Sequence, residues 1–235
     1  MKKLGILLCD DAYPEIQEKH GAHEVSFIKM FESIGYAPQQ YAIWNCHYGE
    51  LPSAVNEADI WLVSGSKWSA YDDYAWIGAL KDFIRQIDLS DKKLLGICFG
   101  HQIVHEALGG KVQKCDQGWG LGAYPIKMKK SFCSLDENEE IRILAMHQDQ
   151  VFHLAHGFEV IASCDFCPNA VTTKQNKILT IQAHPEFYGE LFSMICERIR
   201  PKAGDDMVNI AIANSNLPND NQRIRMVIKD FLFGA

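Results

Sequence analysis

The chain has 235 residues, of which 47% are hydrophobic and 23% charged, a composition typical of globular proteins rather than of disordered or fibrous ones. Its formal net charge is −7, and no run of Lys or Arg exceeds two residues. Nucleic-acid binding requires a concentrated basic surface, so this class of function is excluded. A chain of this length can bury one large core, and we expect a single domain over residues 1–235.

The N-terminal segment 1–10 carries two lysines followed by a short apolar run. That run is too short for a signal peptide, and it ends at Asp10-Asp11 without a small-residue cleavage site. No stretch approaches the roughly 20 apolar residues that cross a membrane. The eight cysteines have irregular spacings, and without an export signal we expect reduced thiols in a cytoplasmic protein with no membrane partner.

The first half of the chain alternates short apolar runs with amphipathic helical patterns. We expect strands at 4–9, 41–44, 59–63 and 93–97. Apolar residues at helical spacing predict helices around 27–34, 76–87 and 103–108, the first of them capped by Gly35. This order predicts an α/β fold of three layers, doubly wound around a mostly parallel central sheet.

After residue 110 the pattern changes to short strand-like runs separated by turns. These runs predict a small antiparallel extension, with strands at 123–128, 141–146, 159–163 and 178–182. Helices are expected again at 191–199 and 224–231, with a polar surface loop at 215–222 between them. We expect the C-terminal helices, about 188–235, to pack on the same domain.

The segment Gly96-Ile97-Cys98-Phe99-Gly100 lies between a predicted strand and a predicted helix. It is the sulfur counterpart of the G-x-S-x-G elbow of hydrolases, in which glycines relieve the crowding of a sharp turn. The N-terminus of the following helix favours a thiolate and offers the amide of Phe99 to an oxyanion. The pattern predicts Cys98 as a nucleophile; the alternative, a buried core cysteine, leaves both glycines without a role.

A thiolate nucleophile needs a base, and the base needs a group that orients it. His184-Pro185-Glu186 follows the predicted strand at 178–182, and Pro185 stiffens the turn there. Glu186 is two residues beyond His184 and can hydrogen-bond its imidazole. The three residues Cys98, His184 and Glu186 are therefore predicted to form a catalytic triad.

Two pairs of side chains have the spacing of metal ligands. His101 and His105 lie one helical turn apart, and Cys164 and Cys167 are separated by two residues. Neither pair is accompanied by the further ligands that a metal site needs. We therefore expect no metal and no cofactor, and we expect the two histidines to be solvated.

The run Gly-Ile-Cys-Phe-Gly-His-Gln at 96–102, followed by His-Pro-Glu at 184–186, resembles the class I, triad-type glutamine amidotransferases. The closer similarity is to their stand-alone, GMP-synthase-like branch, which includes γ-glutamyl peptidases of plants. It covers nearly the whole chain and is carried also by 65–67 with 71–73, 146–151 and 163–170. It implies a flavodoxin-like fold and hydrolysis of a γ-glutamyl amide through a glutamyl-thioester intermediate.

The resemblance also implies which residues hold the substrate. The oxyanion would rest on the amides of Phe99 and of the Gly65-Ser66 turn, although many amidotransferases have two glycines and a proline at that turn. Gln102 would contact the γ-glutamyl group, and His147 and Asp149 would lie beside its pocket, with polar residues of an ordinary turn as the alternative for these two.

Trp119-Gly120 stands where many class I members carry Arg-Glu. A tryptophan offers a large apolar surface at the acceptor side of the site. We hypothesise that Trp119 favours a substrate bulkier or more apolar than free glutamine.

Three functions are compatible with these residues. The first is a stand-alone γ-glutamyl hydrolase acting on a small-molecule substrate, which we favour because this branch is typically free-standing. The second is a glutaminase subunit that supplies ammonia to a separate synthase, and the third is a binding or regulatory module without catalysis. The sequence does not decide whether the partner is a separate synthase subunit or a second copy of the chain in a homo-oligomer.

Overall fold

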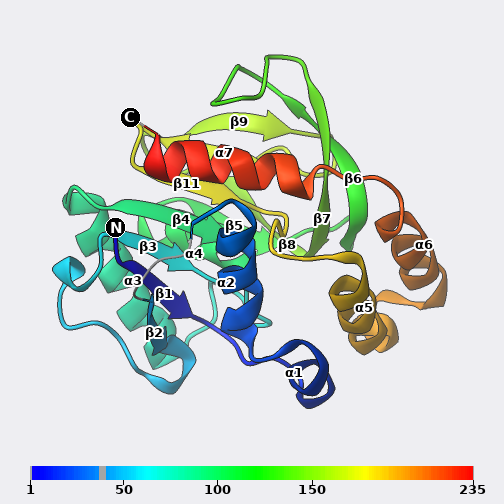
Figure 1. The fold of residues 1–235 in the computed structure, drawn as a ribbon, viewed down its shortest axis with the longest axis horizontal. Helices are drawn as coiled ribbons and strands as arrows, with labels where there is room; N and C mark the ends of the chain where they lie inside the picture. Colours follow the sequence, from blue (N-terminus) through cyan, green and yellow to red (C-terminus); the bar gives the residue numbers. More distant parts are fainter. Residues whose placement is uncertain (1, 37–40, 235) are drawn as a thin grey trace.

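A computed structural model describes residues 2–36 and 41–234 of the protein; the two ends of the expected domain, 1 and 235, lie outside this range. Its main sheet has nine strands in the order β2-β1-β3-β4-β11-β10-β9-β6-β7 (Figure 1). The first five run parallel: β2 (Tyr41–Asn45), β1 (Leu4–Leu8), β3 (Ile60–Val63), β4 (Lys93–Ile97) and β11 (Ile178–Ile181).

The other end of the sheet is antiparallel. Its strands are β10 (Val171–Lys174), β9 (Glu159–Ser163), β6 (Gly120–Met128) and β7 (Glu140–His147). A separate antiparallel pair joins β5 (Lys111–Lys114) to β8 (Asp149–His153).

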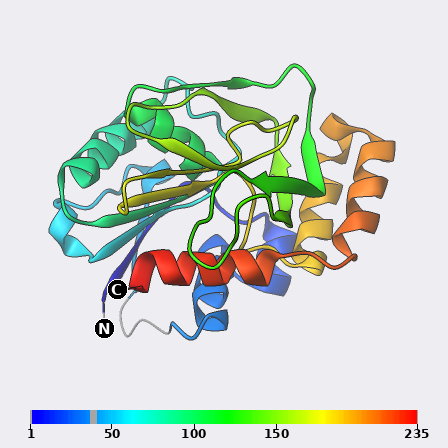
Figure 2. The ribbon, with the colours of Figure 1, turned by 90° about the horizontal axis from the view of Figure 1, so that it is seen from above.

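Helices cover both faces of the sheet and give the molecule three layers (Figure 2). On one face lie α3 (Ala75–Leu89) and α4 (Phe99–Ala107), and on the other lie α2 (His23–Ser33) and α7 (Asn221–Phe233). Strand residues alternate between the two cores, because successive side chains of a strand point to opposite faces. In β1, Ile6 packs with the α2 and α7 residues, whereas Leu7 packs with those of α3 and α4.

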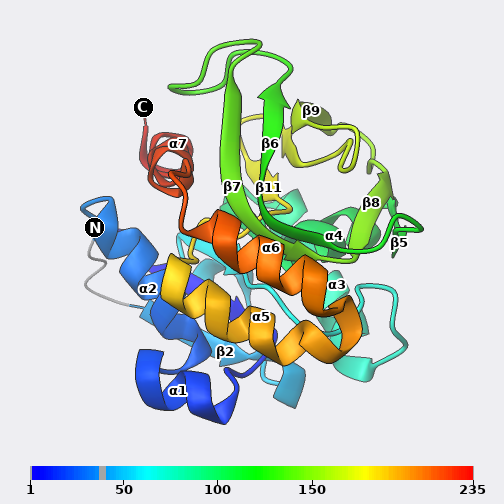
Figure 3. The same ribbon diagram turned by 90° about the vertical axis from the view of Figure 1, so that its right-hand side faces the viewer.

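Three further helices gather at the side where the parallel strands end. They are α1 (Pro14–His20), α5 (Gly189–Ala203) and α6 (Asp205–Ser215), and Figure 3 looks onto them. Two short 3-10 helices, Cys46–Tyr48 and Val55–Glu57, complete the described structure. No helix among the described residues combines the length and the hydrophobicity that crossing a bilayer would take.

The expected α/β fold with three layers is confirmed, and every expected strand and helix is present, with bounds shifted by a few residues. Gly35 ends α2 as expected, with φ of 73° and its amide donating to the carbonyl of Glu32 at 2.9 Å. Helices α1 and α6 and strands β5, β8 and β10 were not foreseen.

One expectation about the sheet is wrong. The run at 178–182 was placed in the antiparallel extension, but β11 pairs with β4 in parallel, with Ile178 beside Leu94 and Ile181 beside Ile97. A short, wholly buried strand has the same apolar pattern in either direction, so its sequence does not reveal its neighbour. Because β11 and β4 are parallel neighbours, the turn after β11, which carries His184, lies beside the turn after β4, which carries Cys98.

Candidate active site

Cys98 occupies a strained turn between β4 and α4. Its backbone has φ of 53° and ψ of −103°, a conformation that non-glycine residues rarely adopt. A Cβ atom at Gly96 would lie 2.6 Å from the carbonyl oxygen of Gly100, and one at Gly100 would lie 2.2 Å from that of Val63. The amide of Cys98 donates to the carbonyl of Ile181 at 2.8 Å. Both glycines of the motif are therefore required by close backbone approach.

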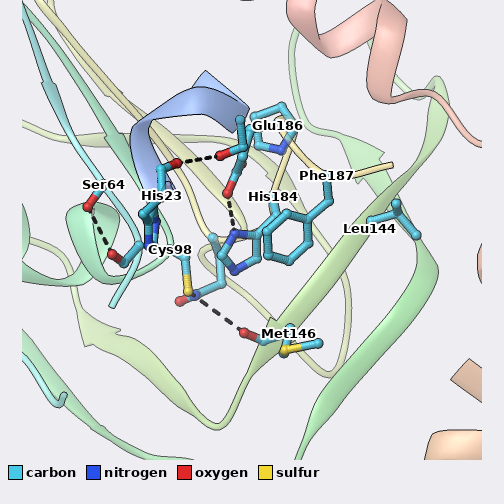
Figure 4. A network of polar contacts seen from close by, with 12 residues as sticks. His23, Ser64, Cys98, Leu144, Met146, His184, Glu186 and Phe187 are labelled. Carbon is cyan, nitrogen blue, oxygen red and sulfur yellow. Dashed lines mark hydrogen bonds and ion pairs between the residues drawn. The ribbon is translucent and has the colours of Figure 1, made fainter. Parts of the chain in front are cut away.

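His184 and Glu186 face each other beside this turn (Figure 4). Nδ1 of His184 lies 2.7 Å from Oε1 of Glu186, and both residues are buried. A Cβ atom at Gly65 would lie 3.1 Å from Cε1 of His184 and 3.8 Å from Cβ of Cys98. The structure thus brings the three predicted triad residues and the turn at Gly65 together at the ends of β3, β4 and β11.

The electrostatics favour a protonated imidazole. Burial by itself would lower the pKa of His184, but the interactions with Cys98 and Glu186, including the hydrogen bond to Glu186, raise that pKa well above its ordinary value. An imidazolium next to the cysteine stabilises the thiolate form of the nucleophile.

The turn that carries His184 is held in place by the last helix. The side-chain amide of Asn221, the first residue of α7, donates to the carbonyls of His184 and Phe187, each at 3.0 Å. Nε of Arg225, one turn further along α7, donates to the carbonyl of Pro185 at 2.7 Å. The role of this helix was not predictable from the sequence, because nothing local in residues 221–225 points to a turn some 40 positions earlier.

The turn at Gly65-Ser66 is fastened to the end of β1. Oγ of Ser66 donates to the carbonyl of Cys9 at 2.9 Å, and the amide of Lys67 donates to Oδ2 of Asp10 at the same distance. The amide of Phe99 belongs to the first turn of α4, whose N–H groups have no partner within the helix. The Gly65-Ser66 turn and the amide of Phe99 thus flank Cys98: Phe99 follows it directly, and the Cβ position of Gly65 lies 3.8 Å from Cβ of Cys98.

Gln102 lies on α4, one turn beyond Cys98, and is buried. Its Nε2 donates to the carbonyl of Asp149 at 2.9 Å and to Oε1 of Gln182 at 3.3 Å. Nε2 of Gln182 in turn lies 3.7 Å from Sγ of Cys98. Gln182 was not singled out from the sequence, although a polar residue that ends the apolar run before His184 was a usable signal.

His147 and Asp149 are already engaged with protein groups. Nδ1 of His147 donates to the carbonyl of Asp149 at 3.1 Å, so its Nε2 accepts from the hydroxyl of Tyr124 at 2.7 Å. Burial lowers the pKa of His147 to about 3, which keeps the ring neutral. The carboxylate of Asp149 accepts from Oγ of Ser69 at 2.6 Å. These contacts fix the segment at 146–149 that forms one wall of the site.

A cavity of about 490 Å³ opens above the thiol, within the range of ordinary small-molecule sites. Eight of the nine predicted site residues line it, Phe99 being the exception; they are Gly65, Ser66, Cys98, Gln102, His147, Asp149, His184 and Glu186. Trp119 lines it as well, as do residues of α1, α2 and α5.

The expectation that His101 and His105 are solvated is wrong. Both are fully buried, because α4 packs between the main sheet and the β5–β8 pair. Nδ1 of His101 bonds the hydroxyl of Thr180 at 2.7 Å, and Nε2 of His105 bonds that of Thr172 at 2.9 Å. Over residues 2–36 and 41–234, no three His, Cys, Asp or Glu side chains are grouped as metal ligands.

Comparison with known proteins places the chain in a family. The family described as glutamine amidotransferase class-I matches residues 34–196. γ-Glutamyl peptidase 2 of Arabidopsis thaliana is 27% identical over 228 residues, which cover 93% of this chain and 91% of that protein. A glutamine-hydrolysing GMP synthase of Porphyromonas gingivalis is 32% identical over 148 residues, 60% of this chain and 27% of that protein.

A solved structure of a glutamine amidotransferase from Thermotoga maritima has the same fold. It superposes with a TM-score of 0.75 at 16% identity and covers 98% of this chain and 96% of that one. The family match extends over most of the chain and includes both the cysteine turn and the His-Pro-Glu turn. The chain therefore belongs to the class I glutamine amidotransferases.

Proposed function

We propose that the protein hydrolyses a γ-glutamyl amide by nucleophilic catalysis at Cys98. The observation that carries this proposal is the position of His184, paired with Glu186 at 2.7 Å and adjoining the strained turn of Cys98 at the floor of a ligand-sized cavity. Membership of the class I glutamine amidotransferases and the similarity to a γ-glutamyl peptidase support this chemistry and this substrate class.

In the first step the thiolate of Cys98 attacks the γ-carbonyl carbon of the substrate. The carbonyl oxygen becomes an oxyanion, which the amides of Phe99 and of the Gly65-Ser66 turn stabilise. As the tetrahedral intermediate collapses, the C–N bond breaks and the imidazolium of His184 gives its proton to the leaving amine. The products of this step are a glutamyl thioester and a free amine.

In the second step the neutral imidazole of His184 removes a proton from water, which attacks the thioester carbon. Collapse of this second intermediate breaks the C–S bond, releases glutamate and restores the thiolate–imidazolium pair. Glu186 does not react. It keeps the proton of His184 on Nδ1, so that Nε2 exchanges protons with the sulfur and the substrate.

A second candidate function is that of a glutaminase subunit that passes ammonia to a separate synthase. The similarity to the amidotransferase part of a GMP synthase favours it, because that match covers only 27% of the synthase. Under this function the same triad would act on glutamine alone, and its rate would rise when the synthase subunit is bound. The contact between His184 and Glu186 beside Cys98 supports catalysis rather than a third function, binding without catalysis.

The test is a panel of γ-glutamyl compounds, glutamine included, assayed for glutamate release with the wild-type protein and with Cys98→Ala. We expect release by the wild type, no release by Cys98→Ala, and a covalent glutamyl adduct on Cys98 that mass spectrometry detects after rapid quenching. Cys133→Ala is the matched control, since Cys133 is exposed and free, and it should retain full activity. Normal turnover by Cys98→Ala would refute the assignment.

A further inference from the structure

The sulfur of Cys98 contacts both a hydrogen-bond acceptor and a hydrogen-bond donor. Its thiol donates to the backbone carbonyl of Met146 at 3.8 Å, the contact drawn in Figure 4. The side-chain amide of Gln182 donates to the same sulfur, with Nε2 3.7 Å from Sγ. A carbonyl oxygen attracts the proton of a thiol and repels a thiolate, whereas an amide N–H is attracted to a thiolate. The two contacts therefore act on the ionisation of Cys98 in opposite directions.

The orientation of the Gln182 amide follows from its neighbours. A carbonyl oxygen cannot donate, so the end of Gln102 that lies 2.9 Å from the backbone carbonyl of Asp149 must be its NH2 group. The same NH2 group lies 3.3 Å from Gln182, so the end of Gln182 that faces it must be the oxygen. The NH2 group of Gln182 is then the end that faces the sulfur of Cys98. A backbone carbonyl thus determines, through two side-chain amides, which atom of Gln182 meets the nucleophile.

The backbone of Gln182 is held in place as well. Its amide donates to the carbonyl of Ala170 at 2.9 Å, and the carbonyl of the preceding Ile181 accepts from the amide of Cys98 at 2.8 Å. Gln182 is only 1% exposed, so bulk solvent does not reach its NH2 group. Burying such a donor costs free energy unless an acceptor compensates, and a neutral thiol is a weak acceptor. A thiolate is the form of Cys98 that satisfies this buried donor.

Other titratable groups approach Cys98 from three elements. His184 and Glu186 lie on the turn after β11, and the pKa of His184 is raised well above its ordinary value by Cys98 and Glu186. Tyr124 approaches from β6, and burial raises the pKa of its hydroxyl well above the ordinary value, which keeps it neutral. His147 ends β7, and burial lowers its pKa to about 3, which keeps that ring neutral too.

The charged groups on the adjoining turns are engaged with other protein groups. Asp10 pairs with Lys67 at 2.5 Å, and the carboxylate of Asp149 accepts from Ser69 at 2.6 Å. His184 is therefore the group that brings a positive charge to the sulfur, and it does so only while it is protonated. An amide is neutral at every pH, so the donor on Gln182 acts on the sulfur in the same way throughout the pH range.

We propose that Gln182 is a further catalytic group, whose NH2 group donates a hydrogen bond to the thiolate of Cys98, and that Gln102 is the positioning residue that holds it in this orientation. The inference rests on the proposed role of Cys98 as nucleophile. The donor acts twice: it increases the ionised fraction of Cys98 before attack, and it stabilises the charge that returns to sulfur when the C–S bond of the thioester breaks. Gln182 transfers no proton, so the balance of both steps is unchanged.

The test measures the rate at which iodoacetamide alkylates Cys98 as a function of pH, by mass spectrometry of the peptide that contains this residue. The thiolate is the reactive form, so the pH of half-maximal rate reports the ionisation of Cys98. Gln182→Met keeps the length of the side chain and removes the donor. Its half-maximal pH should lie about one unit above that of the wild type, a shift of the size expected for losing a hydrogen bond to a charged group.

Two more variants separate a specific effect from a general one. Gln102→Met keeps the Gln182 amide but frees it to rotate, so the half-maximal pH should rise by less, about half a unit. Gln113→Met is the matched control at a half-buried glutamine of β5, and it should keep the wild-type alkylation profile. In Gln182→Met, kcat/KM for glutamate release should fall about tenfold near neutral pH, and this loss should shrink as the pH rises, because the thiolate fraction recovers.

An unchanged half-maximal pH in Gln182→Met would overturn the inference while hydrolysis at Cys98 stands. An equal shift in Gln113→Met would overturn it too, because the effect would then not depend on contact with the sulfur. Alkylation requires no substrate, so the two proposals fail separately: absence of Cys98-dependent glutamate release would overturn the proposed function whatever the alkylation profile.

Discussion

The ring of Phe187 lies flat against the imidazole of His184, with centroids 4.1 Å apart and an angle of 1° between the planes. Two contacts fix this imidazole: the carboxylate of Glu186 at its Nδ1 edge and the phenyl ring on its face. The first sets which nitrogen carries the proton, and the second sets the plane of the ring. Under the proposed mechanism, productive proton transfer needs both, because Nε2 must point at the sulfur and at the leaving amine.

Phe187→Leu should therefore lower kcat about tenfold and change KM little, because the imidazole keeps its charge partners but loses the surface that fixes its plane. Steady-state kinetics with any γ-glutamyl substrate that the enzyme accepts measure kcat and KM separately and so test this expectation. Phe152→Leu is the matched control at an exposed phenylalanine and should retain wild-type kinetics. A variant Phe187→Leu with unchanged kcat would show that Glu186 alone orients His184.

Glu186→Gln should lower kcat about 100-fold or more and shift the pH profile. The negative charges of Cys98 and Glu186 raise the pKa of His184, so the imidazolium persists to a higher pH than in an ordinary histidine. Activity should fall on the alkaline side as His184 loses its proton. Without the carboxylate this pKa drops, and the alkaline limb of kcat/KM should move to lower pH. If the alkaline limb of kcat/KM stays at the same pH in Glu186→Gln, a group other than His184 must cause it.

How much of the site follows from the sequence depends on how local its determinants are. The elbow at Cys98 was predictable because two glycines within five residues report a crowded turn, and the pair His184–Glu186 because its members are two positions apart. The packing of α1 against α5 was not, since α1 was unrecognised and neither helix reveals its partner. Likewise, the burial of His101 and His105 results from the packing of the β5–β8 pair onto α4, which no local pattern shows.

Gly100→Ala should cost about 2 kcal/mol or more in the free energy of unfolding and should abolish activity. The added Cβ would lie 2.2 Å from the carbonyl oxygen of Val63, so β3 or α4 must move, and Cys98 moves with them. Urea denaturation measures the loss. Gly78→Ala is the control: this glycine lies in α3 with no atom within 4 Å of the new methyl, and the change should stabilise the protein by about 0.5–1 kcal/mol.

The Gly65-Ser66 turn, which we propose as the second oxyanion donor, is held by Asp10, and two substitutions separate the contacts that Asp10 makes. Asp10 accepts from the backbone amide of Lys67 at 2.9 Å and from its ammonium at 2.5 Å. Lys67→Met removes the ammonium but keeps the amide, so kcat should fall less than about threefold, since the lysine side chain is half exposed. Asp10→Ala releases the amide and lets the Gly65-Ser66 turn move, so kcat should fall about tenfold or more. Equal losses in the two variants would mean that the ion pair, rather than the backbone contact, holds the turn.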